Sequence, residues 1–397
     1  MPIDFQQVRL QIKALGQNAP ASVEKLAVLK EQARCLLNEH ATNFQALRQK
    51  IETVVRNVDP SVRCALPGRE PLNAAYPTPK FPEQFTLLTA DGSQIYLDRQ
   101  AAMEYFLINI GAIQMSYGSL QAPLKAPHPL VFSDLYCGDL LTFSDEYFDE
   151  DRISLMRDLR ERRILAEIAS QSPQPVITLT DGHLELWGAK ALNAQEGDLF
   201  RQSLDDYLEA LIDLEASEAI AAGYVDKPGE GYVVRLLEIA SQPENEAKKR
   251  PLRGVRDAHL FYGLLAPGER SAIFEIQSRA ASAYKRRKES LALHFFYLNV
   301  GRSERPWLAR VDLPGWVAAN SPKLDSLHAI LIQQCQVLGS RPYPYLLHRA
   351  HEIAVVSLEE KMQLEMMIGN ELRKHGISSE ESHKQWLKNL PGKGRRR

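Results

Sequence analysis

The sequence contains few cysteines, no long apolar run and no excess of charge of one sign. Its four cysteines are widely spaced and form no CxxC pair. This spacing argues against a disulfide framework or a zinc site and favours a reducing compartment. No stretch approaches the roughly 18 uninterrupted apolar residues of a membrane span, and the opening MPIDFQQVRL lacks the apolar core of a signal peptide. We therefore expect a cytoplasmic protein.

The charge balance excludes a uniformly basic surface. Lys and Arg together number 48, Asp and Glu number 50, and the net charge is −2, so any basic surface for nucleic acid must be local. The one obvious basic run, KGRRR at 393–397, is interpreted as a solvated tail. The 397 residues, 44% of them hydrophobic, suffice for the core of one large domain or two ordinary ones.

Residues 3–57 carry a helical pattern, and a proline-rich segment follows it. Apolar residues between Leu26 and Leu36 recur at helical spacing. We predict an N-terminal helical extension over 1–58, made of one or two helices that pack on the main domain or on a partner. The many prolines of 59–84 then predict a linker or an extended strap without regular structure.

Strand and helix patterns share the chain after residue 85. Apolar runs of strand length come first and helical patterns are interleaved later, which predicts an α/β domain over 85–374 with one mixed central sheet flanked by helices. A polar, basic tail is expected at 375–397. The predicted strands lie at 85–90, 94–97, 105–115, 176–180, 218–225, 271–276, 293–300 and 308–313. The predicted helices lie at 151–170, 200–215, 231–241, 319–338, 346–356 and 358–374.

Two Asp-Gly pairs follow β-rich apolar runs, in LLTADGSQIYL at 87–97 and in VITLTDGHLEL at 176–186. Asp-Gly between apolar runs is a strong hairpin-turn signal, because both residues tolerate positive φ. The alternative is that Asp91 and Asp181 project from the ends of rigid strands and share a hard divalent cation. One such pair favours the turn, whereas the repeated pattern raises the weight of the metal site.

A third acid is predicted on the helix DRISLMRDLRERRILAEIAS at 151–170. On a helical wheel Glu161 falls on an apolar side, whereas Glu167 falls on a charged side. A buried acid is costly unless it is paired or binds a metal. Glu161 is therefore either a metal ligand or the ion-pair partner of Arg157 or another arginine, and the sequence leaves both roles open. Asp158, one turn earlier, is a weaker candidate.

The segment RPYPYLLHRAHEIAVV at 341–356 supplies a late histidine. His351 follows a Tyr-Pro-rich entry and begins an apolar run, and His348 lies three residues earlier on a neighbouring part of the helical surface. A single histidine in such a place is more often structural than catalytic. If His351 points at the same cleft as the aspartates, it can bind the metal or move a proton.

Together these segments resemble the NurA nuclease family over most of 86–370. The Gly-Tyr-Val-Asp-Lys-Pro stretch with the Tyr-Val-Val-Arg-Leu-Leu helix after it is specific, each Asp-Gly alone is weak, and the order and spacing of the whole set carry the resemblance. One departure is His183, which stands where a small residue is expected after the second Asp-Gly. The matching segments are TADGSQI at 89–95, ITLTDGHL at 177–184, AAGYVDKPGEGYVVRLLE at 221–238, LARVDLPGWV at 308–317 and PYPYLLHRAHEIAVVSLEE at 342–360.

The resemblance implies a ribonuclease H-like fold, a homodimer, and DNA nuclease activity that depends on two manganese or magnesium ions. It implies 5′–3′ exonuclease and single-strand endonuclease activity in DNA end resection and repair, with a hexameric HerA-type translocase as partner. It assigns Asp91 and Asp181 to the family's paired aspartates. It assigns His351 to the late histidine and Tyr343 to a tyrosine near the site. Glu161 is the match for the helical glutamate, although no distinctive motif surrounds it.

Phosphodiester hydrolysis explains why these groups would be needed. A phosphodiester is anionic, and divalent ions neutralise its charge, lower the pKa of bound water and stabilise the leaving oxygen. Under the resemblance Asp91 bridges the two ions, and Glu161 and Asp181 complete one ion each. His351 ligates the second ion or protonates the leaving group, and its nitrogen would favour manganese over magnesium. Tyr343 positions a phosphate or stacks on a base.

Two other functions stay open from the sequence. A nuclease-dead relative that only binds DNA or a translocase would not need Asp91, Asp181 and His351. A metal hydrolase of small phosphoesters would not need the basic segments at 248–256 and 278–290. These segments are either contacts to DNA phosphates or ordinary solvated surface.

Overall fold

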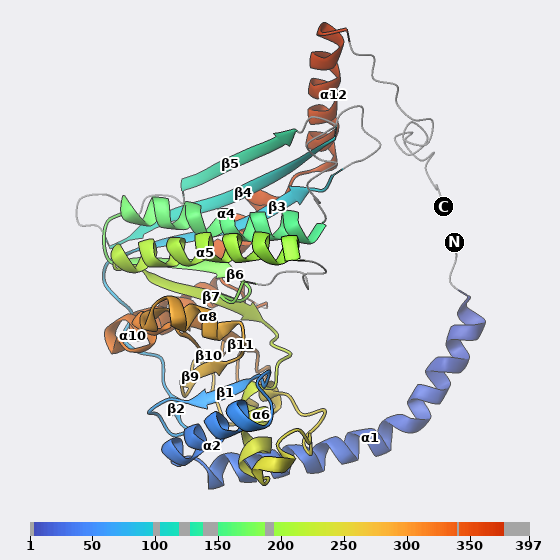
Figure 1. Ribbon diagram of the computed structural model, residues 1–397, viewed down its shortest axis with the longest axis vertical. Helices are drawn as coiled ribbons and strands as arrows, with labels where there is room; N and C mark the ends of the chain where they lie inside the picture. The colour runs from blue at the N-terminus through green and yellow to red at the C-terminus, as the bar shows by residue number, and fades with distance from the viewer. Residues whose placement is uncertain are drawn as a thin grey trace. The chain divides into compact units, whose positions relative to one another are not determined.

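The computed structural model describes residues 4–97, 104–118, 128–137, 150–186, 194–339 and 341–376 (Figure 1). Within these ranges the chain divides into two compact units. Unit 1 comprises 1–82, 182–185 and 221–344, and unit 2 comprises 83–181, 186–220 and 345–397. The predicted tail lies outside the described residues from 377 onward, and so does the KGRRR run.

Unit 2 is built on a mixed sheet with the strand order β6-β3-β4-β5. Its strands are β3 (Phe85–Ile95), β4 (Tyr105–Tyr117), β5 (His128–Cys137) and β6 (Val176–Asp181). The first three form an antiparallel meander, and β6 lies parallel to β3. This arrangement confirms the predicted α/β class with a mixed central sheet, and it fits the ribonuclease H-like fold implied by the resemblance.

Helices cover both faces of the unit 2 sheet. Helices α4 (Glu150–Ser170) and α11 (Tyr345–Ala354) pack directly on its strands, and the unit also contains α5 (Ala194–Ala216) and α12 (Leu358–Lys374). Helix α4 packs on β3, β4 and β6 and runs beside α5 (Figure 1). Helix α11 packs on β3, β4 and β5. Gly92 faces α4, whereas Gly111, the partner of the preceding residue Asp91, faces α11. Since neighbouring residues of a strand point to opposite faces, α4 and α11 lie on opposite faces.

Unit 1 has a sheet of antiparallel pairs that includes the strand order β9-β10-β11-β7, with β1 at the outer side of β9. The short strands β2 and β8 pair with each other, and β8 also pairs with β10. The strands are β1 (Cys64–Pro67), β2 (Ala75–Tyr76), β7 (Ile220–Asp226), β8 (Arg270–Ser271), β9 (Phe274–Gln277), β10 (Leu293–Asn299) and β11 (Leu308–Pro314). Stacked rings of Phe261, Tyr297, Phe274 and Phe295 fill the core.

The helices of unit 1 include the predicted N-terminal extension. The α-helices are α1 (Phe5–Glu39), α2 (Phe44–Asn57), α6 (Tyr232–Ala240), α7 (Asp257–Phe261), α8 (Ala281–Arg287), α9 (Gly315–Ala318) and α10 (Ser321–Val337). Two 3₁₀ turns are η1 (Glu244–Glu246) and η2 (Glu289–Leu291). Helix α2 packs on α6 and β1 and buries Leu47, Ile51 and Val54. The extension therefore builds part of the core of unit 1.

The proline-rich segment contains regular structure, so the prediction of an unstructured linker at 59–84 was wrong. Strands β1 and β2 both lie in it, and β1 pairs with β9 over its whole length. Proline lacks the backbone N–H, so it is tolerated at strand ends and at the edges of sheets. Pro67 is the last residue of β1, and β1 is the terminal strand of the unit 1 order.

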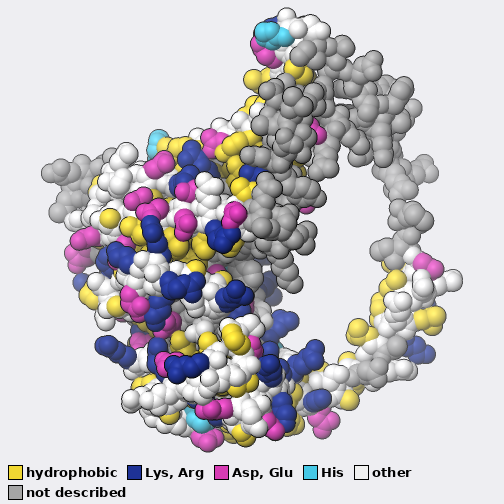
Figure 2. All heavy atoms as spheres, viewed as in Figure 1, with side chains coloured by type: hydrophobic (Ala, Val, Ile, Leu, Met, Phe, Trp, Pro, Cys, Tyr) yellow, Lys and Arg dark blue, Asp and Glu magenta, His cyan; other side chains and the backbone are white. Residues whose placement is uncertain are grey.

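The first half of α1 exposes apolar side chains, which are visible as yellow spheres along that helix (Figure 2). Phe5, Leu10, Ile12 and Leu15 are 73%, 72%, 63% and 72% exposed, whereas Ala33 in the second half is buried. In the part of the chain that the structure describes, no helix is both long and apolar enough to cross a membrane.

Candidate active site

Asp91 lies inside a strand. Strand β3 is paired with β4 from Phe85 opposite Tyr117 to Ile95 opposite Leu107, and Asp91 stands opposite Gly111. The hairpin-turn interpretation of this Asp-Gly pair was therefore wrong, and the predicted strands at 85–90 and 94–97 are one strand. Cross-strand pairing over the full length of β3 outweighs the local turn preference.

The backbone of Asp181 lies beside that of Asp91 on the neighbouring strand. The parallel register of β3 and β6 runs from Thr86 beside Val176 to Ala90 beside Thr180. The next step places Asp181, the last residue of β6, beside Asp91. Neighbouring strands lie about 4.8 Å apart, and residues in register share a face. The second Asp-Gly thus ends a strand, as the metal-site alternative requires, and the side chain of Asp181 is exposed.

His351 contacts Asp91 directly. Its Nδ1 lies 2.6 Å from Oδ2 of Asp91, and the two side chains are 62% and 18% exposed. Helix α11 carries His351 and is tied to the sheet by hydrogen bonds from Thr89 Oγ1 to Leu346 O (3.0 Å) and from Asn109 Nδ2 to Ala354 O (2.7 Å). The late histidine therefore contacts the first aspartate.

Glycine at position 111 permits this approach. A Cβ at position 111 would lie 2.6 Å from both Ala350 O and Ala354 N of α11. Both are backbone atoms of a packed helix and cannot move aside cheaply. The partner of Asp91 across the sheet is thus a glycine because the helix that bears His351 passes directly over it.

Glu161 approaches β3 from α4, on the face of the sheet opposite to the one that α11 and His351 cover. Its side chain is buried, with 8% of the residue exposed. A Cβ at Gly92 would lie 2.6 Å from its Oε1, so this glycine permits close approach of the carboxylate to β3. Burial, followed by the charges of Asp158 and Asp91, raises the pKa of Glu161 well above its usual value, although Arg157 opposes the shift. The negative charge of Asp91 therefore acts on Glu161.

Arg157 partly neutralises this cluster of acids. Its Nε lies 3.6 Å from Glu161 Oε1, and its Nη2 lies 2.6 Å from Asp158 Oδ1. The ion pair predicted as the alternative role of Glu161 is therefore present. Burial raises the pKa of Asp158 too, despite the nearby arginine. Negative charge in the cluster of Asp91, Asp158 and Glu161 exceeds what Arg157 compensates.

A second arginine lies beneath the cluster and was missed from the sequence. Arg162 is 2% exposed, and its Nη2 donates to Thr180 Oγ1 at 2.9 Å. Its Nε and Nη1 have no hydrogen-bond partner in the described part of the chain, and its guanidinium lies 5.4 Å from the ring centre of Tyr207. The helical pattern was the available sequence signal, because it places both Glu161 and the next residue, Arg162, on inward sides of α4.

The residues fit a divalent cation by the chemistry of their donors. Asp91, Asp181 and Glu161 offer carboxylate oxygens and His351 offers an imidazole nitrogen, the ligands that manganese accepts. A buried carboxyl with a raised pKa is unfavourable as an anion unless positive charge is added. Among the described residues, however, no group of three or more His, Cys, Asp or Glu side chains converges as a formed metal site.

Tyr343 belongs to unit 1, whereas the other predicted site residues belong to unit 2. Its ring packs edge-on against Tyr224, with 5.5 Å between ring centres. A role for Tyr343 at the phosphate or base remains a prediction.

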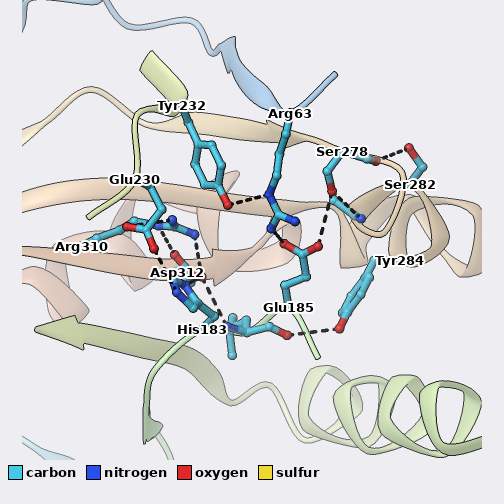
Figure 3. A network of polar contacts seen from close by, with 12 residues as sticks. Arg63, His183, Glu185, Glu230, Tyr232, Ser278, Ser282, Tyr284, Arg310 and Asp312 are labelled. Atoms are coloured by element: carbon cyan, nitrogen blue, oxygen red, sulfur yellow. Dashed lines mark hydrogen bonds and ion pairs between the residues drawn. The ribbon is translucent and has the colours of Figure 1, made fainter. Parts of the chain in front are cut away.

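A buried polar network in unit 1 holds the segment after Asp181 (Figure 3). Arg310 binds Asp312 through Nε (2.7 Å) and Nη2 (3.0 Å). His183 lies between two acids, with Nδ1 3.3 Å from Asp312 Oδ2 and Nε2 3.2 Å from Glu230 Oε1. Although burial opposes it, these acids raise the pKa of His183 to about 9. His183 is therefore a charged member of a structural network.

The two basic segments singled out in the sequence are partly used by the fold. In α8, Lys285 pairs with Glu275 at 2.8 Å and with Glu289 at 3.2 Å. In the 248–256 segment, Arg250 pairs with the buried Glu238. Some of their charge is thus satisfied inside unit 1, which favours the surface interpretation for those residues.

A protein-family model, the NurA domain, matches residues 85–356. The chain belongs to the NurA nuclease family. The match includes Asp91, Glu161, Asp181 and His351, and it begins where β3 begins.

Solved structures give weaker likenesses to this NurA protein. A NurA crystal structure with manganese is 10% identical, covers 74% of this chain and 91% of its own, and has a TM-score of 0.39. Human endonuclease V is 11% identical, with coverage of 68% and 82% and a TM-score of 0.31. Its catalytic domain is 13% identical, with coverage of 84% and 98% and a TM-score of 0.33. These scores are low, so the family assignment rests on the domain match. No curated protein matches the chain.

Proposed function

We propose that this NurA protein is a metal-dependent DNA nuclease whose active site lies in unit 2. The observation that carries the proposal is the position of Asp91. This residue contacts His351 at 2.6 Å, lies one register step from the Ala90–Thr180 pair and hence beside Asp181, and contributes to the raised pKa of Glu161.

Asp91, Glu161, Asp181 and His351 would hold the cation. A bound divalent ion supplies charge neutralisation at the phosphodiester and a more acidic water. The carboxylates orient it from two strands and a helix, which are rigid supports. We propose two ions, for which Asp91 would be one of the ligands, and the histidine nitrogen would favour manganese over magnesium.

His351 has a second capacity, as a proton carrier. When its Nδ1 donates to Asp91, the ring is oriented and Nε2 is left to give a proton to the leaving oxygen. The side chain of His351 is 62% exposed, so it is accessible to a DNA strand. This is the role in which Asp91 acts as a positioning partner as well as a metal ligand.

The finer function follows from membership of the family. We propose 5′–3′ exonuclease and single-strand endonuclease activity in DNA end resection and repair, in a homodimer that works with a hexameric HerA-type translocase. The alternative is a nuclease-dead module that binds DNA or the translocase. The only partly compensated acids around Glu161 support the nuclease, because a binding module for an anionic polymer gains nothing from buried carboxylates.

Cleavage of a labelled single-stranded oligonucleotide by the full chain tests the proposal. In manganese we expect degradation, and in EDTA none. Asp91→Asn should lower the rate by about a hundredfold or more, because a metal ligand and the orienting partner of His351 are both lost. Asp205→Asn, which changes an exposed acid of α5, should remain within about twofold. If the unaltered protein binds the oligonucleotide in manganese and never cuts it, the nuclease-dead alternative holds.

A further inference from the structure

The turn that joins β10 to β11 in unit 1 is held in one conformation. Its ends are closed by hydrogen bonds from Arg302 N to Arg305 O (3.1 Å) and from Arg305 N to Arg302 O (2.9 Å). The buried Asn299 accepts from Gly301 N at 3.1 Å and from Trp307 N at 3.2 Å through its Oδ1. A Cβ at Gly301 would lie 2.3 Å from Trp307 N. The turn is thus a built feature of the sheet.

Two arginines project from this turn without an acid partner. Arg302 and Arg305 face each other as an antiparallel bridge pair, which places their side chains on the same side of the ribbon. Both are exposed, and within the described ranges neither guanidinium makes an ion pair or a side-chain hydrogen bond. Glu304 lies between them in the chain and is exposed as well. Arg302 and Arg305 differ in this respect from Lys285 and Arg250, whose charges are already held in ion pairs within the fold.

An oriented indole stands next to the arginines. Trp307 Nε1 donates to Asp226 Oδ1 at 2.7 Å, and the Lys227 ammonium lies 4.4 Å from the centre of the indole ring. Lys227 adopts φ 49°, the left-handed region that a non-glycine residue rarely occupies. Such backbone strain tends to persist where function requires it. The three cations outnumber the two acids, Asp226 and Glu304.

A pocket of about 430 Å³ opens beside the turn. This volume lies within the range of small-molecule sites, roughly 300–1,000 Å³. Its wall combines the arginine pair and Trp307 with the end of α10, which brings Cys335 and Gln336. Burial raises the pKa of Cys335 to about 12, so this thiol stays neutral and adds neither negative charge nor a metal ligand. The pocket therefore offers an aromatic wall, an amide, two cations and one carboxylate, that of Glu304.

We propose that this pocket binds one nucleotide unit of a single-stranded nucleic acid. Arg302 and Arg305 hold the phosphodiester, because paired guanidiniums match phosphate oxygens. The base enters the pocket against Trp307, within reach of the Gln336 amide. An acidic peptide would satisfy the arginines but would leave the pocket unfilled, so the nucleotide fits the combination better. This inference rests on the proposed nuclease function and gives its strand a second point of contact.

Binding without cleavage tests the pocket. The full chain is titrated into a fluorescein-labelled oligo-dT in EDTA, and anisotropy gives the Kd at several salt concentrations. The double variant Arg302→Gln/Arg305→Gln should bind about tenfold more weakly, and the slope of log K against log salt should fall by about one. Arg56→Gln/Arg69→Gln removes two exposed arginines of the same unit that lie outside both basic segments, and this variant should bind like the unaltered protein. All variants should keep the melting temperature, since these side chains have no partner to lose.

An abasic strand separates the pocket from simple charge. The unaltered protein should bind oligo-dT several-fold more tightly than an abasic strand of equal length, and the Arg302/Arg305 variant should show a smaller preference. Equal affinity of both double variants, or no preference for bases, would overturn the proposal. The proposal would also be overturned if a polyglutamate peptide displaced oligo-dT at a lower concentration than that of the oligo-dT, and if this displacement required Arg302 and Arg305. Because EDTA prevents cleavage, this assay measures binding separately from activity. A protein that binds the strand in EDTA and does not cut it in manganese would refute the nuclease and leave the pocket proposal standing.

Discussion

At the scale of single residues, the account rests on carboxylates whose charge is only partly compensated. Arg157 is the one cation in direct contact with Glu161 and Asp158 among the described residues. It lies where added positive charge would be most favourable. A divalent cation and Arg157 should therefore act on the same group of acids.

Replacement of Arg157 should make the protein more dependent on metal. We expect Arg157→Gln to lower the melting temperature in EDTA, because the repulsion among Glu161, Asp158 and Asp91 is then opposed by the charge of Arg162 without that of Arg157. Manganese should raise the melting temperature of this variant by more than it raises that of the unaltered protein. Arg160→Gln, which breaks the pair with Asp134 at 2.7 Å, is the matched control. A smaller response of Arg157→Gln to manganese would contradict the metal site.

A second residue, His328, predicts how stability depends on pH. It is fully buried, its Nε2 lies 2.7 Å from Gly268 O, and its Nδ1 has no partner in the described chain. Burial lowers the pKa of His328 from 6.5 to about 4. The unfolded chain therefore binds a proton that the folded protein refuses between these values, so stability falls as pH drops from 6.5 toward 4. The loss is on the order of 3 kcal/mol.

Denaturant unfolding at a series of pH values checks this prediction. His328→Gln should start less stable and should lose less of its unfolding free energy between pH 6.5 and 4. His348→Gln, on the half-exposed surface of α11, should keep the pH dependence of the unaltered protein. Parallel curves for His328→Gln and the unaltered protein would show that this histidine does not titrate as the structure requires.

At the scale of elements, the site depends on how closely two helices approach the β3–β4 pair. Gly92 admits α4 with Glu161, and Gly111 admits α11 with His351. The approach of α11 is the stricter one, because a Cβ at position 111 would meet backbone atoms, whereas one at position 92 would meet side-chain atoms. Packing of these helices therefore sets the distances between the functional groups.

Gly111→Ala should displace α11 and impair the site. The added methyl group overpacks a closed interface, which costs typically 1–3 kcal/mol, and we expect a lower melting temperature with at least tenfold lower nuclease activity. Gly229→Ala is the matched control, because a Cβ there has no atom within 4 Å. Activity and melting temperature of Gly111→Ala that equal those of the control would contradict the close approach of α11.

The sequence predicts these elements better than their contacts. The strand predicted at 176–180 is β6 (Val176–Asp181), and the helix predicted at 358–374 is α12, because both have clear periodicity and end signals. The Asp-Gly pair at 91–92 suggested a hairpin turn, which was wrong. Local turn preference cannot show that β4 pairs with β3 along its entire length. The inward position of Glu161 was predictable from a helical wheel. Its pair with Arg157 was predicted as one alternative. The electrostatic influence of the buried Arg162 was not, because burial is set by the whole unit.

At the scale of the whole molecule, the division into two units cuts across the sequence. Unit 1 takes 182–185 from the middle of the chain, directly after Asp181. Local periodicity carries no information about such an arrangement, so a single domain over 85–374 was predicted. A homodimer is also a matter of the whole molecule. The first half of α1 carries apolar side chains that the described residues leave exposed.

The exposed half of α1 should mediate self-association. An isolated helix of this kind is marginal in water, and burial of its apolar face against a second copy would stabilise it. Ile12→Glu/Leu15→Glu should therefore shift the mass measured by light scattering from dimer toward monomer. Gln11→Glu/Gln17→Glu adds the same charge at exposed polar positions of the helix and should leave the mass unchanged. A dimer that survives the first change would place the interface elsewhere.

The central claim is that Asp91, Glu161, Asp181 and His351 serve one cation site, and a crystal structure of the full chain soaked in manganese tests it most directly. The account predicts an anomalous manganese peak coordinated by Asp91 and by at least two of the other three side chains. A peak bound elsewhere, or a structure in which Asp91 keeps only its contact with His351 at saturating manganese, would contradict it.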